Sequence, residues 1–158
     1  MLEQGGTGWQ KIQSAFSAVR MWGAGVHTAY AVQITLALLL AATIAWLWQS
    51  NAVFELKASA LATGSLLATP YVLDYDLVVL AVAIAFFARH GQRRGFRDYE
   101  VSLLAAAWIV PLLSRSVVGV SGIPLGLMVL LAFYAFTLQR AVRDGTSSAA
   151  GARQIAQA

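Results

Sequence analysis

The chain has 158 residues, of which 59% are hydrophobic and 11% are charged, and its formal net charge is +4. A soluble domain carries about 25% charged residues, so this composition favours a membrane protein. Its basic residues lie in short segments between apolar runs, which is typical of membrane topology and not of nucleic-acid binding. The sequence contains no cysteine, which excludes disulfides, thiolate metal sites and cysteine nucleophiles.

The chain begins with a glycine-rich segment, residues 1–8, that is predicted to be flexible. Beyond it, apolar residues recur with a helical period at Trp9, Ile12 and Phe16. This spacing predicts an amphipathic helix over 9–22 that lies in the membrane interface with its apolar side down. The alternative is an ordinary connecting segment that packs on the domain. No secretory signal peptide is predicted, because the basic-then-apolar order is missing.

Apolar runs follow, which we interpret as about five membrane spans of an all-α, multi-pass bundle. The first run is flanked by Tyr30 at one end and by Trp46 and Trp48 at the other, matching the aromatic belts of membrane interfaces. The predicted spans are 26–49, 56–72, 75–90, 101–116 and 123–139. After them, residues 141–158 are rich in Ala, Gly, Ser and Gln and are predicted to form a disordered tail.

The basic residues set the expected orientation, because cytoplasmic segments carry an excess of Lys and Arg. A five-span arrangement places the arginine-rich segment 89–100 inside and leaves Lys11, Arg20 and Arg115 outside. A four-span arrangement, with 56–88 as one Pro-kinked helix, fits the charge bias equally well. We favour five spans because a central aspartate is disfavoured by about 2.5–3.5 kcal/mol on insertion scales. The expected location is a cell membrane, such as the bacterial inner membrane.

The most unusual stretch is 66–80, where Asp74 and Asp76 lie between two apolar runs. Ionisable groups surrounded by so much apolar sequence indicate a functional site. Pro70 precedes them and lacks a backbone donor, so a helix is expected to end or kink there. We therefore expect a tight turn that carries both aspartates to the membrane surface. The alternative is a turn wetted by headgroup water, in which the aspartates serve solubility alone.

The predicted extracytoplasmic face collects several polar side chains, namely Arg20, His27, Asp74, Asp76 and Arg115. Arginine presents a planar fork that binds phosphate, and a carboxylate can deprotonate a hydroxyl or orient a sugar. This combination suits a phosphate-bearing lipid substrate. Structural alternatives exist, because Arg20 can anchor the interfacial helix and Arg115 can neutralise an aspartate. The two histidines of the chain are too isolated to suggest a metal site.

Three segments carry a resemblance to a known family: 17–23 (Ser-Ala-Val-Arg-Met-Trp-Gly), 29–33 (Ala-Tyr-Ala-Val-Gln) and 68–77 (Ala-Thr-Pro-Tyr-Val-Leu-Asp-Tyr-Asp-Leu). Together they resemble the C-terminal part of glycosyltransferase family 87, whose members are integral membrane enzymes of the C superfamily. The resemblance extends over about 9–140. It implies transfer of a hexose, typically mannose, from a polyprenyl-phosphate carrier to an extracytoplasmic lipid or glycan acceptor.

The most specific part of the resemblance is Thr69-Pro70 followed by Asp74-Tyr75-Asp76. Mannosyltransferase members of the family have Ser-Pro and Asp-His-His at these places. The resemblance implies that the acidic stretch, Tyr75 included, contacts the substrate.

Within this hypothesis Arg20 and Arg115 would meet the phosphate of the carrier, as the chemistry of their guanidinium groups suggests. The family's proposed catalytic base is an aspartate in the first extracytoplasmic loop, which lies N-terminal of the matched region, so no catalytic residue is expected here. The chain would then be a portion of a longer protein, inactive alone, with the missing N-terminal part as its partner. The donor would be the lipid-linked sugar, with no other cofactor, no metal and no nucleic acid.

Two other functions fit the same residues. A small membrane transporter or channel subunit would bind a proton or cation at Asp74 and Asp76, because broken helices with carboxylates mark such sites. A structural membrane scaffold would need neither aspartate.

Overall fold

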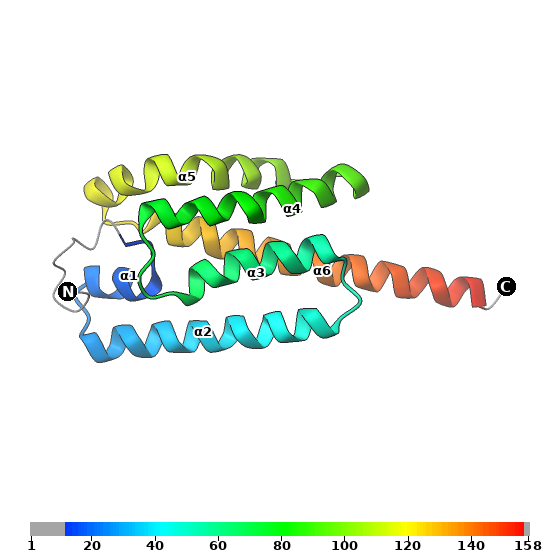
Figure 1. Cartoon of the computed structure of the whole chain (residues 1–158), viewed down its shortest axis with the longest axis horizontal. Helices are drawn as coiled ribbons and strands as arrows, with labels where there is room; N and C mark the ends of the chain where they lie inside the picture. Colours follow the sequence, from blue (N-terminus) through cyan, green and yellow to red (C-terminus); the bar gives the residue numbers. More distant parts are fainter. Residues whose placement is uncertain (1–11, 157–158) are drawn as a thin grey trace.

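The computed structural model describes the backbone of residues 12–156, together with their side chains except those at 74, 75, 115 and 146–156. Over this range the chain is helical and contains no strand, so the predicted all-α class is confirmed. Figure 1 shows the elements in chain order: α1 (Ala15–Met21), α2 (Val26–Gln49), α3 (Phe54–Ala68), the 3-10 helix η2 (Asp74–Val78), α4 (Val79–Arg94), α5 (Glu100–Ser121) and α6 (Leu125–Ala156).

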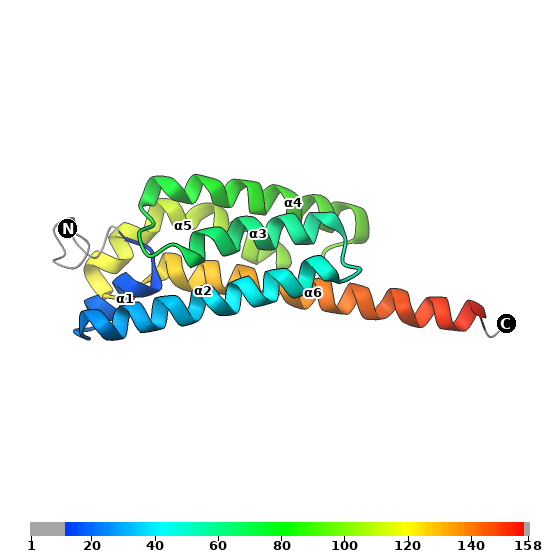
Figure 2. The same ribbon diagram turned by 60° about the horizontal axis from the view of Figure 1, so that its bottom comes forward.

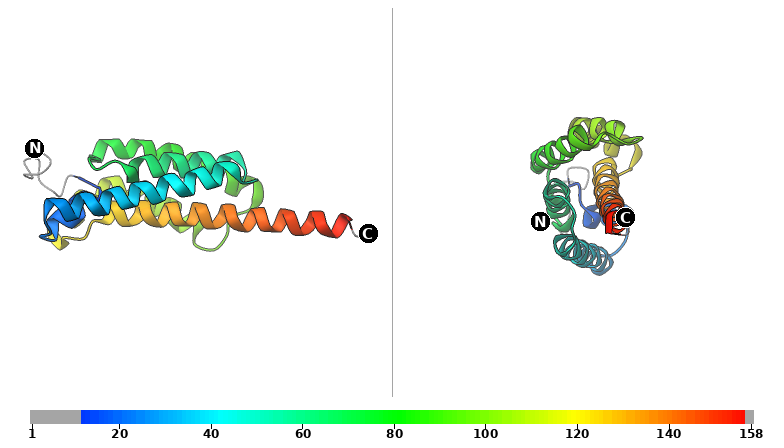
Figure 3. Two further views of the ribbon diagram at one scale, coloured as in Figure 1. Left: turned by 90° about the horizontal axis from the view of Figure 1, so that it is seen from below. Right: turned by 90° about the vertical axis from the view of Figure 1, so that its right-hand side faces the viewer.

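The long helices run alternately up and down the long axis of the molecule (Figures 1 and 2). Seen along that axis, α2, α3 and α4 lie in succession, and α6 packs against α3 and α5 (Figure 3). Two ends result. We call one the aspartate end, formed by residues 12–25, 69–78 and 115–124. The other is the arginine end, formed by residues 50–53, 89–100 and 139–145.

The core lies between α3, α4 and α6. Leu56 and Ala60 on α3 are fully buried. Phe87 on α4 meets Phe133 on α6 with their ring centroids 5.4 Å apart. Ser59 of α3 donates a hydrogen bond to a backbone carbonyl of α4, over 3.0 Å, which is possible because the two helices approach closely. The central helices therefore have many apolar side chains buried in the core, whereas the outer helices have many of theirs exposed.

The outer surface is unusually apolar. Val78 is 76% exposed, Leu112 78% and Val120 93%. Two helices, Val26–Gln49 and Leu125–Gly145, are long and apolar enough to cross a membrane, and Glu100–Ser114 is a shorter apolar helix. Only 17% of the most apolar part of α2 is buried, whereas the core helix of a soluble protein is mostly buried. These two helices are candidate membrane spans.

The first helix differs from the expected interfacial helix. It covers Ala15–Met21 and begins at Ser14, whose side chain accepts a hydrogen bond from the backbone N–H of Ser17. The polar residues Gln13, Ser14 and Ser17 are buried, whereas a helix lying in the interface would expose them. The segment packs on the domain, where the ring of Phe16 contacts the ring of Tyr30 in α2, with the two centroids 4.7 Å apart. Residues 9–11 of the prediction lie outside the described part.

The break between the second and third apolar runs lies where the sequence predicts it. Helix α3 ends at Ala68, two residues before Pro70. The chain then crosses to η2 and returns as α4, so this region consists of two antiparallel helices and not of one kinked helix. Because η2 takes residues 74–78, α4 begins at Val79, later than the predicted position 75.

Two later boundaries also differ from the prediction. Helix α5 continues through Pro111 to Ser121, because a proline costs one hydrogen bond but neighbouring helices can hold the chain in place. Helix α6 does not end at 139 but extends to Ala156, where a disordered tail over 141–158 is expected. An ion pair between Arg140 and Asp144, four residues apart, supports this extension; residues 157–158 lie outside the described part.

Candidate functional site

The turn that carries the aspartates is tied to the start of the chain. The backbone N–H of Gln13 donates to the carbonyl of Val72 over 2.8 Å, and Ile12 forms an isolated antiparallel bridge with Leu73. These contacts fix the extended part of the turn before η2 begins. The segment before α1 therefore holds the turn in place, in addition to the contacts within the turn itself.

Asp76 has a structural role within this turn. Its Oδ2 atom accepts a hydrogen bond of 2.9 Å from the backbone N–H of Leu73 and so caps η2. The side chain is half-buried and forms no ion pair with any other side chain that the structure describes. Asp74 and Tyr75 lie on the same 3-10 turn by their backbones. The predicted acidic stretch is thus a single short turn at the aspartate end.

The remaining predicted residues also lie at this end, but their described contacts are separate. Arg20 stands in the last turn of α1 and donates to the carbonyl of Ala24 over 2.8 Å, which holds the turn into α2. His27 is exposed in the first turn of α2. The backbone of Arg115 lies in α5, four residues after Pro111. The fold therefore brings all five predicted positions to one end.

Gln33 is a residue of this region that the sequence reasoning did not select. Its side chain is buried, and its Oε1 atom accepts from the backbone N–H of Phe16 over 3.1 Å. Its Nε2 atom donates to the carbonyls of Leu67 and Ala68, each at 3.0 Å. The last carbonyls of a helix lack partners within that helix, so Gln33 satisfies the end of α3 and joins α1, α2 and α3. A lone glutamine inside an apolar run was the available signal.

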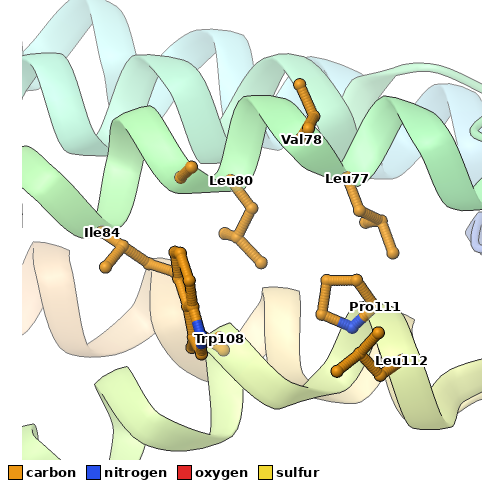
Figure 4. A pocket seen from close by; sticks show the side chains of 9 residues that line it. Leu77, Val78, Leu80, Ile84, Trp108, Pro111 and Leu112 are labelled. Carbon is orange, nitrogen blue, oxygen red and sulfur yellow. The ribbon is translucent and has the colours of Figure 1, made fainter.

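An apolar groove of about 370 Å³ lies between α4 and α5 and begins directly after the acidic turn (Figure 4). We call it the α4–α5 groove; its lining residues are Leu77, Val78, Leu80, Ala81, Ile84, Ala107, Trp108, Pro111 and Leu112. Leu77 and Val78 are the last two residues of η2 and follow Asp76 immediately. In Figure 4, Leu80 of α4 and Trp108 of α5 face the space between the two helices. The groove thus joins the polar turn to an apolar surface.

The arginine end contains a polar cluster that the sequence did not predict. Arg140 is 3% exposed and its Nη1 atom donates to both carboxylate oxygens of Glu100, at 2.8 and 2.9 Å. The same guanidinium donates to the carbonyl of Gly95 and, through Nε, to Asp144. His90 lies 2.8 Å from Asp144. This cluster joins α4, α5 and α6.

Further ion pairs surround this cluster at the surface. Arg97 contacts Asp144 over 2.8 Å, and Glu55 at the start of α3 pairs with Arg93 over 2.8 Å. The arginine-rich segment is therefore partly neutralised by acids from other helices. Among the residues that the structure describes, no group of three or more His, Asp or Glu side chains is placed to hold a metal ion.

Comparison of the chain with models of protein families, with curated proteins and with solved structures finds no match.

Proposed function

We propose that the chain is a multi-pass membrane domain and forms the C-terminal portion of a glycosyltransferase. The enzyme moves a mannose-like hexose from a polyprenyl-phosphate carrier to an extracytoplasmic lipid or glycan acceptor. Membrane insertion is supported by the apolar outer surface, since soluble proteins rarely expose contiguous apolar patches of more than a few hundred Å². In a bilayer the same side chains face lipid and incur no such cost.

Five spans are supported by the alternation of α2 to α6. Each successive helix reverses direction, so the acidic turn and the arginine-rich segment lie at opposite ends (Figure 1). The positive-inside rule then places the arginine end in the cytoplasm and the aspartate end outside. Helix α3 has 15 residues, about 22 Å of helix, and is accommodated by local thinning of the bilayer.

A single observation carries the assignment of the site: the acidic turn opens directly into the α4–α5 groove. A lipid-linked sugar has a polar head and an apolar chain, so its site must present polar groups next to an apolar surface. Asp76 lies in the polar turn, and the next residue, Leu77, lines the apolar groove. A small soluble ion needs polar ligands but no apolar surface beside them, so this arrangement favours a lipid-linked substrate over an ion.

The residues of the proposed site have different roles. Asp76 fixes the geometry of η2 through its cap, and Asp74, Tyr75, Arg20 and Arg115 contact the sugar or its phosphate. The arginines suit phosphate because their planar guanidinium binds two oxygens at once. The catalytic base comes from the N-terminal part of the longer protein, as the family resemblance implies.

The test is hexose transfer by the longer protein that contains this chain. Asp74→Asn is expected to reduce kcat/KM about a hundredfold, because misplacing a bound substrate can cost a factor of this size. The matched control is Asp98→Asn, because Asp98 is an exposed aspartate at the arginine end. Unchanged transfer kinetics and donor affinity in Asp74→Asn and Asp76→Asn would remove both residues from the site.

Two alternatives have an observation in their favour. The cap formed by Asp76 favours a structural scaffold, which predicts that Asp76→Asn alters stability alone and that Asp74→Asn changes nothing. The helix break before η2 favours a transporter or channel subunit. That function predicts pH-driven uptake into proteoliposomes that Asp74→Asn abolishes, in the absence of any sugar donor.

A further inference from the structure

We propose that the 94–99 segment, which joins α4 to α5, binds the headgroups of anionic phospholipids at the cytoplasmic face of the membrane. The inference rests on the membrane insertion and orientation of the proposed function, and it makes no use of sugar transfer. Three features of the arginine end support it: an excess of positive charge, an exposed arginine outside the described ion pairs, and exposed aromatic rings.

Positive charge is in excess at the arginine end and balanced at the aspartate end. Together with the first turn of α3, the arginine end spans residues 50–57, 89–100 and 139–145, which contain seven Lys or Arg and four Asp or Glu. The residues of the aspartate end contain two of each kind. The cytoplasmic leaflet has a negative surface potential that attracts basic segments next to a membrane span. The arginine end therefore fits a membrane surface that contains anionic lipid.

Arg94 is exposed and lies outside the ion pairs that the structure describes. One residue earlier, Arg93 pairs with Glu55 over 2.8 Å. Arg97 pairs with Asp144 over the same distance. A guanidinium presents a planar fork to two phosphate oxygens, so Arg94 is the residue that takes the lipid phosphate.

The buried cluster of the arginine end holds the backbone of the segment in place. Arg140 donates to the carbonyl of Gly95 over 3.0 Å. The backbone N–H of Arg97 donates to a carboxylate oxygen of Glu100 over 2.8 Å. Binding costs less when the receptor is already ordered, so a headgroup meets a preformed surface.

Tyr99 closes the segment in a backbone conformation that favours glycine. Its φ is 67° and its ψ is −7°, in the left-handed region that bulky residues rarely adopt. The residue is 77% exposed, so its ring adds little to the core. Tyrosine is enriched at membrane interfaces, where its ring meets the acyl chains and its hydroxyl meets water. Backbone strain is often kept for function, and the membrane interface supplies that function here.

Other exposed aromatic residues lie at the same end. Phe96 is partly exposed, and its ring lies so close to Gly91 that a Cβ atom there would collide with it. Trp46 and Trp48, near the end of α2, are also exposed. Because α2 and α5 lie on opposite sides of the bundle (Figures 1 and 3), exposed rings stand on both sides of the arginine end. Such a belt marks the level of the membrane interface and places the 94–99 segment among the headgroups.

Spin labelling locates the segment relative to the membrane. The 158-residue chain has no cysteine, so Asp98→Cys and Ile109→Cys each create one labelling site, in vesicles of phosphatidylcholine and phosphatidylglycerol. Both positions are exposed, and Ile109 lies about 15 Å along α5 from the segment, half the thickness of the hydrocarbon core. We expect the label at 98 at headgroup depth and the label at 109 deep in the hydrocarbon.

The two labels separate failure of this inference from failure of membrane insertion. A label at 98 in bulk water, with the label at 109 in the hydrocarbon, would overturn headgroup binding alone. A label at 109 in water would overturn the membrane insertion on which both proposals rest.

Binding of fluorescent phosphatidylglycerol to the chain in neutral detergent tests the role of Arg94. We expect Arg94→Gln to weaken binding about fivefold, the effect of one basic residue near an anionic surface. Arg94→Lys keeps the charge and is expected to retain most of the affinity. Labelled phosphatidylcholine is expected to bind all three proteins equally. Equal phosphatidylglycerol affinity in the wild type and Arg94→Gln would contradict the proposal.

Tyr99→Gly tests whether the tyrosine serves the membrane or the fold. Glycine adopts a positive φ without strain, so the melting temperature is expected not to fall. Phosphatidylglycerol binding is expected to weaken several-fold through the loss of the interfacial ring. A lower melting temperature with unchanged lipid binding would show that Tyr99 serves the fold and would remove it from the lipid site.

These outcomes are independent of the test of sugar transfer, because Arg94 and Tyr99 lie at the opposite end of the bundle from Asp74. Normal transfer by Asp74→Asn, with weakened phosphatidylglycerol binding in Arg94→Gln, would reject the proposed transfer site and leave this inference intact. Lost transfer in Asp74→Asn, with equal phosphatidylglycerol affinity in Arg94→Gln, would reject this inference alone.

Discussion

The two ends of the bundle differ in how their polar groups are satisfied. At the arginine end, Arg140 and Glu100 are almost completely buried and form an ion pair in which Nη1 contacts both carboxylate oxygens; Arg140 also pairs with Asp144 through Nε. At the aspartate end, Gln33 and Asp76 bond to backbone groups. Charges from α3, α4, α5 and α6 meet at the first end, whereas the second combines backbone caps with an open apolar groove.

This difference separates stability from ligand binding. Buried charges that are mutually paired are expensive to disturb singly, because removing one partner leaves the other buried and unpaired. At the aspartate end the described bonds of Gln33 and Asp76 go to backbone groups, so they hold the backbone without a buried ion pair. We therefore expect substitutions of the buried charges at the arginine end to affect folding, and substitutions of charged residues at the aspartate end to affect function.

The largest expected effect is that of Arg140→Ala. It leaves the carboxylate of Glu100 buried without its partner, so the free energy of unfolding is expected to fall by about 3–5 kcal/mol. Denaturant unfolding in detergent measures this change. Arg94→Ala is the control, because Arg94 is exposed on the neighbouring helix α4, and a surface change of this kind stays within about 0.5 kcal/mol.

A double variant sharpens this test. Arg140→Met with Glu100→Gln removes both charges, and the unfolding free energy is expected to recover a large part of the loss, because replacing a whole buried pair costs less than breaking it. A loss in the double variant equal to the sum of the two single losses would show that the pair is not coupled. The buried ion pair would then not explain why the arginine end differs from the aspartate end.

The second-largest expected effect is that of Gln33→Leu, at the aspartate end. Gln33→Leu removes the hydrogen bonds that the buried amide makes to the N–H of Phe16 and to the carbonyls of Leu67 and Ala68. The unfolding free energy is expected to fall by about 1–3 kcal/mol, the cost of unsatisfied buried polar groups. Gln49→Leu, an exposed glutamine at the end of the same helix, is the control. An equal response of the two variants would mean that the amide does not hold the three helices together.

Sequence reasoning recovered the features that depend on local chemistry. The first apolar run matches α2, and Pro70 predicts the end of α3, because residue type and spacing decide both. It did not recover contacts between residues far apart in the chain. Gln33 lies 34 residues from Leu67, and no local pattern shows that one side chain completes the end of another helix.

The same distinction applies to the candidate site. The unusual surroundings of Asp74 and Asp76 predict the acidic turn, but the α4–α5 groove depends on how α4 and α5 pack, which no local pattern of residues shows. The arginine-rich segment predicts membrane topology, but its own residues do not show which acids they pair with. Its acidic partners come from other helices: Glu55 from α3 and Asp144 from α6. Only the spacing of four residues between Arg140 and Asp144 gave a local hint of the cluster.

The smallest expected effect tests whether burial, and not charge itself, makes the arginine end rigid. Glu55 pairs with Arg93 at 2.8 Å, the same distance as in the buried pair, but the side chain of Arg93 is 59% exposed. Water and salt screen such a pair, so Glu55→Gln is expected to lower the unfolding free energy by only about 0.2–1 kcal/mol, and by less at high salt. Denaturant unfolding at low and high salt measures both effects. A salt-independent loss as large as that of Arg140→Ala would mean that exposure has no influence here, and that the rigidity of this end comes from the number of its ion pairs.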